Sequence, residues 1–177
     1  MRTIIAVAAA LSAATLGSAS AQQQQQTPPC STLEFRQMDF WLGTWDAHYS
    51  ADTSQPPGGA NVITREYGNC VIQEQFDGGP QAQGLIGHSV STYHAPTRQW
   101  RQTWVDNQGG YFALTGGPVG DDFILTNSRI TDGAPYQRMV FEDITANSFT
   151  WRWQSSTDAG ATWTDAWVIH YVRRAPG

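Results

Sequence analysis

The feature that most constrains the fold is a repeated β pattern that begins near residue 43. Apolar and polar side chains alternate in runs of strand length, and Gly, Pro, Asn and Asp separate these runs about every 10 to 13 residues. No stretch has a convincing helical period. A sheet of consecutive hairpins loses its exposed edges when it closes on itself. The sequence therefore predicts an all-β fold: a single closed or nearly closed antiparallel up-and-down barrel of about ten strands.

Local turn signals set the expected strand limits, because glycine permits a positive φ in tight hairpins. A short helix over Leu33–Leu42 is expected to close one mouth of the barrel. The expected turns are Gly68-Asn69, Asp77–Pro80, Asn107–Gly109, Gly116–Pro118 and Asp132-Gly133. The expected strands lie near residues 44–51, 59–67, 70–78, 84–93, 99–106, 110–116, 122–129, 136–142, 148–155 and 163–173.

The N-terminal segment is expected to direct export and to take no part in the fold. Arg2 supplies a positive charge, residues 4–16 are apolar but too short to span a bilayer, and Ala19-Ser20-Ala21 resembles a signal-peptidase site. A short transmembrane anchor is the alternative. We predict a signal peptide over 1–21, a disordered Gln- and Pro-rich leader over 22–32, and the barrel over 33–174. The mature protein is expected in the periplasm or the medium, with no attachment to a membrane.

The charge of the mature chain argues against polyanionic partners. Without Arg2, nine cationic side chains, all Arg, stand against fifteen carboxylates, a net charge of −6 with His neutral. Nucleic acids and anionic lipids bind clustered cations, and this chain has no basic run. Neither partner is therefore expected.

The two cysteines, Cys30 and Cys70, suit an oxidising compartment. We predict a disulfide that joins the leader to an early strand. Closing a loop of about 40 residues stabilises a fold by about 4 kcal/mol in the chain-entropy model. A reactive thiol or a metal pair is the alternative, but nearby His or Cys ligands are lacking.

One turn carries a specific motif. Residues 156–163 match the S-x-D-x-G-x-T-W pattern of an Asp box. We expect Asp158 to accept hydrogen bonds from its own turn, Gly160 to take the strained dihedrals, and Trp163 to pack back on the hairpin. The motif recurs in sialidase propellers, but a single copy in a chain this short predicts a hairpin and not a glycosidase.

Alternation assigns the aromatic side chains to the inside of the barrel. Glu74 shares its face with Ile72 and Phe76, where an unpaired carboxylate is costly, so it should have a partner or a raised pKa. Two roles stay open for it: a buried structural network, or a carboxylate that orients a ligand or transfers a proton. The residues expected inside are Trp100, Gln102, Trp104 and Asp106, then Phe149, Trp151 and Trp153, then Trp163, Trp167, Ile169 and Tyr171.

The candidate ligand site is built around Glu74, the one catalytic candidate. Its predicted hydrogen-bond donors are Ser89, Tyr93 and Gln102, and the predicted source of positive charge is Arg138. The full set of candidate ligand-binding residues is Glu74, Ser89, Tyr93, Trp100, Gln102, Trp104, Arg138, Trp151 and Tyr171.

The histidines lack the spacing of a metal site. His48, His88 and His170 fall on faces opposite the aromatic sets, so solvent is expected around them. The chain also lacks a G-x-S-x-G nucleophile elbow and a phosphate-binding glycine loop ahead of a helix. We therefore expect neither a metal nor a cofactor.

Several motifs in order resemble a bacterial, commonly exported family with a lipocalin-like (calycin) barrel. The resemblance covers almost all of residues 30–173 and implies a ten-stranded barrel, with Trp45 plugging one end, but no settled activity. The motifs are Asp39-Phe40-Trp41-x-Gly43-x-Trp45, Gly68-Asn69-Cys70-Val71-Ile72-x-Glu74, Gly87-x-Ser89-x-x-x-Tyr93, Trp100-x-Gln102-x-Trp104-Val105-Asp106-x-x-Gly109, and the Asp-box hairpin.

A more distant resemblance is to nitrobindin-type haem barrels, which share the entry Leu42-Gly43-Thr44-Trp45. Those barrels bind haem through a histidine near the C-terminal end. His170 is the one candidate here, and alternation turns it outward, so haem is not expected.

Three functions follow from this barrel. The leading one is an exported module that binds a small apolar or aromatic molecule. The second is an enzyme that uses Glu74 as acid or base for isomerisation, cyclisation or elimination, which rests on analogy between folds. The third is a structural or protein-interaction role, which predicts an occluded lumen and an exposed apolar patch. The oligomeric state is not predicted.

Overall fold

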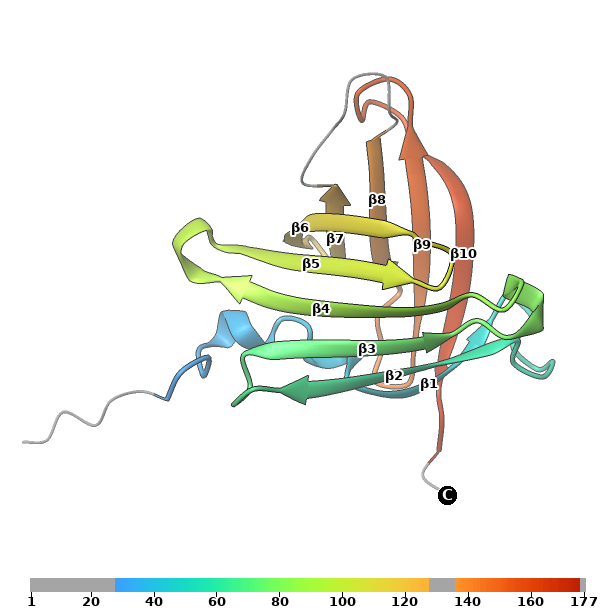
Figure 1. The fold of residues 1–177 in the computed structure, drawn as a ribbon, viewed down its shortest axis with the longest axis horizontal. Coiled ribbons are helices and arrows are strands. Elements are labelled where there is room, and N and C mark those ends of the chain that lie inside the picture. The colour runs from blue at the N-terminus through green and yellow to red at the C-terminus, as the bar shows by residue number, and fades with distance from the viewer. Residues whose placement is uncertain (1–27, 128–135, 176–177) are drawn as a thin grey trace, which may run out of the picture.

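The computed structural model describes residues 28–127 and 136–175, and these residues form a closed antiparallel barrel. Each strand pairs with its neighbours in sequence, and β1 pairs with β10 to close the sheet. In Figure 1, β2 to β5 run across the view and β8 to β10 run nearly perpendicular to them, so the two halves of the barrel cross. The predicted fold class is confirmed. The predicted signal peptide, residues 22–27 of the leader and the turn at Asp132-Gly133 lie outside the described residues.

The strand limits agree with the predicted ones within three residues, and the largest differences are at the ends of β1 and β6. The strands are β1 Gly43–His48, β2 Gly59–Glu66, β3 Val71–Asp77, β4 Ile86–His94, β5 Gln99–Asp106, β6 Tyr111–Val119, β7 Asp122–Asn127, β8 Tyr136–Glu142, β9 Ser148–Ser156 and β10 Thr164–Arg173. Four short 3-10 helices are η1 Leu33–Arg36, η2 Asp39–Trp41, η3 Pro80–Ala82 and η4 Ala95–Thr97.

The segment before β1 closes one end of the barrel, although two 3-10 turns, η1 and η2, replace the single short helix expected. Met38 and Trp45 are completely buried there. The Trp45 indole N–H donates to the Trp41 carbonyl at 2.7 Å, and the Arg173 guanidinium lies 4.0 Å from the centroid of the Trp45 ring. A cation over a desolvated indole face is an attractive contact. Trp45 therefore seals this end, as expected.

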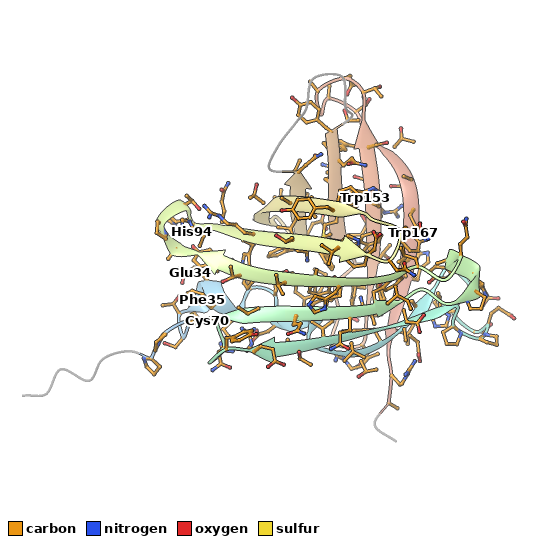
Figure 2. The ribbon with its side chains drawn as sticks, in the orientation of Figure 1. Glu34, Phe35, Cys70, His94, Trp153 and Trp167 are labelled. Atoms are coloured by element: carbon orange, nitrogen blue, oxygen red, sulfur yellow. A yellow bond between two sulfur atoms is a disulfide. The ribbon has the colours of Figure 1, made fainter. Side chains whose placement is uncertain are left out.

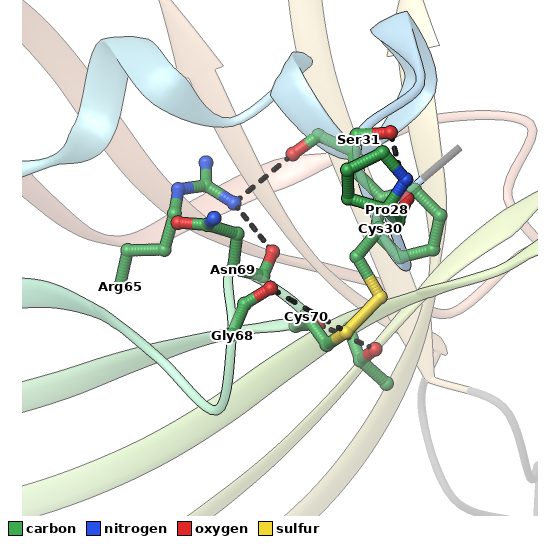
Figure 3. The surroundings of a disulfide bond; sticks show 9 residues. Pro28, Cys30, Ser31, Arg65, Gly68, Asn69 and Cys70 are labelled. Atoms are coloured by element: carbon green, nitrogen blue, oxygen red, sulfur yellow. Dashed lines mark hydrogen bonds between the residues drawn. A yellow bond between two sulfur atoms is a disulfide. The ribbon is translucent and has the colours of Figure 1, made fainter. Parts of the chain in front are cut away.

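The closing segment is tied to the barrel wall at two points (Figure 3). The predicted Cys30–Cys70 disulfide is formed, and it joins the segment before η1 to the residue preceding β3. Beside it, Arg65 of β2 donates to the carbonyls of Phe35 and Asn69 at 3.2 and 3.0 Å and pairs with Asp39. The disulfide and the contacts of Arg65 together hold this closing segment in the mouth of the barrel. We call the segment, which contains η1 and η2, the plug.

Glycine permits one close contact inside the barrel that decides where an indole lies. Gly87 of β4 faces inward, and a Cβ at this position would overlap the Trp104 ring. Trp104 is opposite Ser89 in the β4–β5 register, so its side chain lies across the space that Gly87 leaves open. The missing side chain in β4 therefore sets the position of a cavity wall in β5.

One predicted turn is wrong. Gly116–Pro118 continues β6, and the chain turns later, at Gly120-Asp121. The reason is close packing between strands: a Cβ on Gly116 would overlap the backbone oxygen of Ile124 in β7. Glycine at this position allows strands to approach and does not mark a reversal.

The predicted face of Trp163 is also wrong. A register shift between Asp165 and Trp167 adds a residue to β10, and from there to the hairpin the alternation is reversed. Trp167 remains inside, whereas Trp163 lies outside under the Arg138 guanidinium, 4.1 Å from its ring centroid. A bulge shifts side chains to the other face without changing the residue types that alternate.

Candidate ligand-binding site

A cavity of about 180 Å³ occupies the half of the lumen away from the η1–η2 plug. Trp41 of η2 and Glu74 of β3 form the inner end of the cavity, next to the plug. Leu85 and Asp106 lie toward the open mouth. Figure 2 shows Trp153 and Trp167 at that end of the barrel, opposite Phe35, His94 and Cys70. The lumen is therefore filled by side chains at one end and open at the other.

Aromatic rings from opposite sides of the barrel form the cavity walls. Trp151 and Trp153 stack with centroids 6.3 Å apart and an interplanar angle of 10°, and Trp167 meets Trp151 edge-on at 5.8 Å. Phe76 contacts both Trp104 and Trp167, at 6.1 and 5.8 Å. These rings also pack against one another, so the wall holds its shape without a ligand.

Glu74 is the polar centre of the cavity. Its side chain is buried, with 7 % of the residue exposed, and its carboxylate accepts hydrogen bonds from two neutral donors. The Asn61 amide donates to Oε1 at 2.7 Å, and the Ser89 hydroxyl donates to Oε2 at 2.6 Å. Both donors lie opposite or diagonal to Glu74 on the neighbouring strands β2 and β4. The predicted need for a partner is met by hydrogen bonds and not by a cation.

Burial dominates the protonation of this carboxyl. Removal from water raises the pKa of Glu74 to about 7, and the hydrogen bonds from Ser89 and Asn61 only partly oppose that rise. Burial, with the nearby Glu74 charge, also raises the pKa of Tyr171 well above its ordinary value. Glu74 therefore exchanges its proton near neutral pH, which suits both ligand orientation and acid–base chemistry.

Asn61 is able to serve both protonation states of Glu74. Its amide nitrogen lies 3.4 Å from the Tyr171 hydroxyl as well as near Glu74, while its Oδ1 is buried without a hydrogen-bond partner. Rotating the amide by half a turn would present Oδ1 to a protonated Glu74. After this rotation, Asn61 Oδ1 would accept the hydrogen bond that protonated Glu74 donates.

The predicted ligand-binding residues divide into two groups by position. Glu74, Trp104, Trp151 and Tyr171 line the cavity, and Ser89 supports Glu74 from behind. Their role as ligand contacts stays a prediction. The others lie elsewhere: Gln102 donates to Ser91 at 3.0 Å, Trp100 donates to Gln37 at 3.0 Å, and Tyr93 packs edge-on against Phe35 at 5.3 Å.

Gln102 and Tyr93 therefore do not donate to Glu74, contrary to expectation. Alternation predicted correctly that both face inward, but they occupy levels nearer the plug. Arg138 is also misplaced in the prediction. It lies on the outer face, where its Nε donates to Gln154 at 2.7 Å and its guanidinium covers Trp163. No charge contact with Glu74 forms, because the side chains of β8 that face the lumen are Met139 and Phe141.

One histidine is not solvated as expected. His48 is outward on β1, yet only 6 % of it is exposed. Its register partner on β10 is His170, whose side chain projects from the same face. Within residues 28–127 and 136–175, no group of three or more His, Cys, Asp or Glu side chains is placed to hold a metal ion.

Sequence reasoning missed several residues of the site, among them Asn61, Trp153 and Trp167. Asn61 occupies an inward position of the predicted strand 59–67, so a polar residue at inward parity was the available signal. Trp153 and Trp167 were assigned to the inner face but were not included among the candidates. Their convergence with Trp104 across the barrel depends on closure, which alternation does not report.

The Asp box folds as predicted and lies outside the cavity. Asp158 accepts hydrogen bonds from the backbone N–H of Thr162 at 2.8 Å and from the Ser156 hydroxyl at 2.7 Å. Gly160 takes a φ of 89°, and the Trp163 indole donates to the Gly160 carbonyl at 3.1 Å. Hydrogen bonds from the Thr162 hydroxyl, the Thr162 backbone N–H and the Ser156 hydroxyl lower the pKa of Asp158 to about 2. The motif stabilises the β9–β10 hairpin and contributes nothing to the cavity lining.

Comparison with known proteins supplies neither a family nor a function, so the function is inferred from the geometry of this site. In the described part of the chain, no helix is both long and apolar enough to cross a membrane. No protein-family model matches the sequence, and no curated protein is significantly similar to it.

Proposed function

We propose that this chain is an exported barrel protein that binds one small, mostly apolar or aromatic molecule in its lumen. The observation that carries the proposal is the aromatic cavity of about 180 Å³ that ends on the buried Glu74 carboxyl. An apolar cavity of about 150 Å³ is large enough to bind benzene. A ligand with one ring therefore fits, and the few polar groups at the inner end would fix its orientation.

Export belongs to the same proposal. The predicted signal peptide supports it, and the Cys30–Cys70 disulfide suits an oxidising compartment. The motifs that resemble an exported family with a lipocalin-like barrel support it further.

Blocking the mouth of the cavity tests the binding function. Leu85 lines the cavity just before β4, whereas its neighbour Ile86 is 55 % exposed on the outer face. We expect the mature protein to bind toluene or benzyl alcohol in isothermal titration calorimetry, and Leu85→Trp to weaken that binding by at least tenfold because the indole fills the opening.

The matched control is Ile86→Trp, which adds the same indole one residue away on the outside. It should bind both probes as the unmodified protein does. Equal affinities for the two variants would show that these probes bind elsewhere. Absence of binding in the unmodified protein would contradict the function.

A second candidate function is an enzyme that uses Glu74 as a general base. The observation in its favour is a buried carboxyl with a pKa of about 7 that faces the cavity beside Tyr171. A base titrating near the working pH contributes typically 10²- to 10⁴-fold to proton transfer. The predicted chemistry is removal of a proton from a carbon acid, as isomerisation, cyclisation or elimination requires.

Deuterium exchange tests this second function without knowledge of the substrate. Phenylacetone is a small aromatic ketone with acidic α-hydrogens, and NMR in D₂O follows their replacement. We expect the unmodified protein to catalyse exchange and Glu74→Gln to lower the rate by at least about 10². Equal rates for the two proteins would remove Glu74 from this role and leave the binding function standing.

A further inference from the structure

The charges that line the cavity are all of one sign. Glu74 faces its inner part and Asp106 lies toward the mouth, and among the described residues that line the cavity there is no Arg, Lys or His. Asp106 is ionised near neutral pH, because hydrogen bonds from the Trp104 indole and from the backbone of Gly110 and Gln108 hold its pKa below the ordinary value. A carboxylate, Asp106, therefore lies near the mouth of the cavity, and a second carboxyl, Glu74, lies at its inner end.

The groups that face Glu74 do not neutralise it. Asn61 of β2 and Ser89 of β4 donate neutral hydrogen bonds, and Tyr171 of β10 is an uncharged phenol at neutral pH. The negative charge of an ionised Glu74 is therefore not offset by a cationic partner, and the surroundings of low polarity solvate it poorly. The site therefore favours a positive charge brought in from outside.

Three of the described arginines bind groups outside the cavity. Arg173 covers Trp45 and donates to the Leu42 carbonyl at 2.8 Å, both within the plug. Arg65 also binds the plug, through Phe35 and Asp39, and Arg138 covers Trp163 on the outside. None of these cations contacts the cavity lining.

The walls add to the same preference. Ring faces carry negative electrostatic potential, so several tryptophans around one cavity attract an organic ammonium group. Trp104, Trp151, Trp153 and Trp167 all line this cavity, together with Phe76. A carboxylate within an aromatic enclosure matches the two requirements of an ammonium ion, a counter-charge and polarisable walls without competing water.

We infer that the lumen binds a small organic cation, with its ammonium group between Glu74 and the tryptophan rings. The inference rests on the proposed binding function and names the class of its ligand. The affinity for such a cation depends on pH, whereas the affinity for a neutral ligand would not. The cation favours ionised Glu74, whose free pKa is about 7, so affinity for the cation rises as the pH passes through neutrality.

A pair of isosteric probes isolates the charge. Choline and 3,3-dimethylbutan-1-ol have the same shape, and choline keeps its charge at every pH. Titration calorimetry on the oxidised mature protein at pH 8 should show choline binding at least tenfold more tightly than the alcohol. At pH 5.5 the affinity for choline should fall by at least tenfold, whereas that for the alcohol should not change.

Glu74→Gln provides the matched variant, since the amide keeps the shape of the carboxyl and removes the charge. Its affinity for choline at pH 8 should fall by at least tenfold, and its affinities for both probes should not change between pH 5.5 and pH 8. The tryptophan rings and Asp106, which remain, leave a smaller preference for choline. Equal binding of both probes by the unmodified protein at pH 8 would overturn the inference. So would binding of toluene or benzyl alcohol without choline, although the proposed function would then stand. Failure of every probe, neutral and charged, would overturn both.

Discussion

Replacing Glu74 by Gln is expected to stabilise the protein at pH 8 by roughly 3 kcal/mol and to leave its stability at pH 4 almost unchanged. Burial raises the pKa of Glu74 from an ordinary value of 4.5 to about 7, so above pH 7 the native protein holds a charge that the unfolded chain would solvate. Gln removes this charge, keeps the bond from Ser89, and donates to the Asn61 Oδ1 once that amide rotates.

The pH dependence has a definite sign. Between about pH 4.5 and 7 the native carboxyl is protonated while the unfolded one is ionised, so the native state binds more protons. The free energy of unfolding therefore falls as the pH rises through this window and levels off above it. The opposite slope is expected from carboxyls whose pKa is lowered, such as Asp158 at about 2, and it lies at lower pH.

Urea unfolding followed by tryptophan fluorescence at pH 5 and pH 8 checks this prediction. The slope should be present in the unmodified protein and absent in Glu74→Gln. Glu34→Gln is the control, because a hydrogen bond from the Thr32 hydroxyl holds the pKa of Glu34 below its ordinary value. It should keep the slope. Destabilisation of Glu74→Gln at pH 8 would show that the ionised carboxylate is a net stabilising group.

Removing the disulfide is expected to cost about 4 kcal/mol of stability in the chain-entropy model. Cys30 and Cys70 are 40 residues apart, so the bond closes a loop that includes the plug, β1 and β2. Without it the unfolded chain gains the freedom of that loop. The native barrel keeps the contacts of Arg65 with Phe35, Asn69 and Asp39, so its shape should persist.

The double variant Cys30→Ser/Cys70→Ser and the reduced unmodified protein should both show the lower urea midpoint. Their native tryptophan spectra should match that of the oxidised protein, since Trp41 and Trp45 remain buried in the plug. A loss of less than about 1 kcal/mol would mean that the unfolded chain is already compact around this loop. A changed native spectrum would instead mean that the disulfide holds the plug in place.

Much of the fold was predictable because its signals are local. The alternation along β3 correctly placed Glu74 inside with Ile72 and Phe76, and that along β9 placed Trp151 and Trp153 inside. Turn chemistry gave the Asp-box hairpin with its Asp158 contacts. These signals need only neighbouring residues, so a single sequence carries them.

The wrong predictions at Gly116 and Trp163 both arise from interactions between neighbouring strands. Gly116 was read as a turn, although its missing side chain serves the approach of Ile124 on the next strand. Trp163 was placed inside, although an extra residue near Asp165 reverses the alternation of β10. Both depend on how a strand meets its partner. Residue types along one strand do not report this.

The sequence by itself determined the ten-strand barrel, the cysteine pair and the inward carboxyl of Glu74. Tertiary structure alone decided what meets that carboxyl: Asn61 and Ser89 from adjacent strands, Tyr171 from across the closure, and none of the described arginines. Alternation fixes the face of a side chain, whereas its height in the lumen depends on register and closure between strands. The level at which each residue lies is what separates the plug from the cavity.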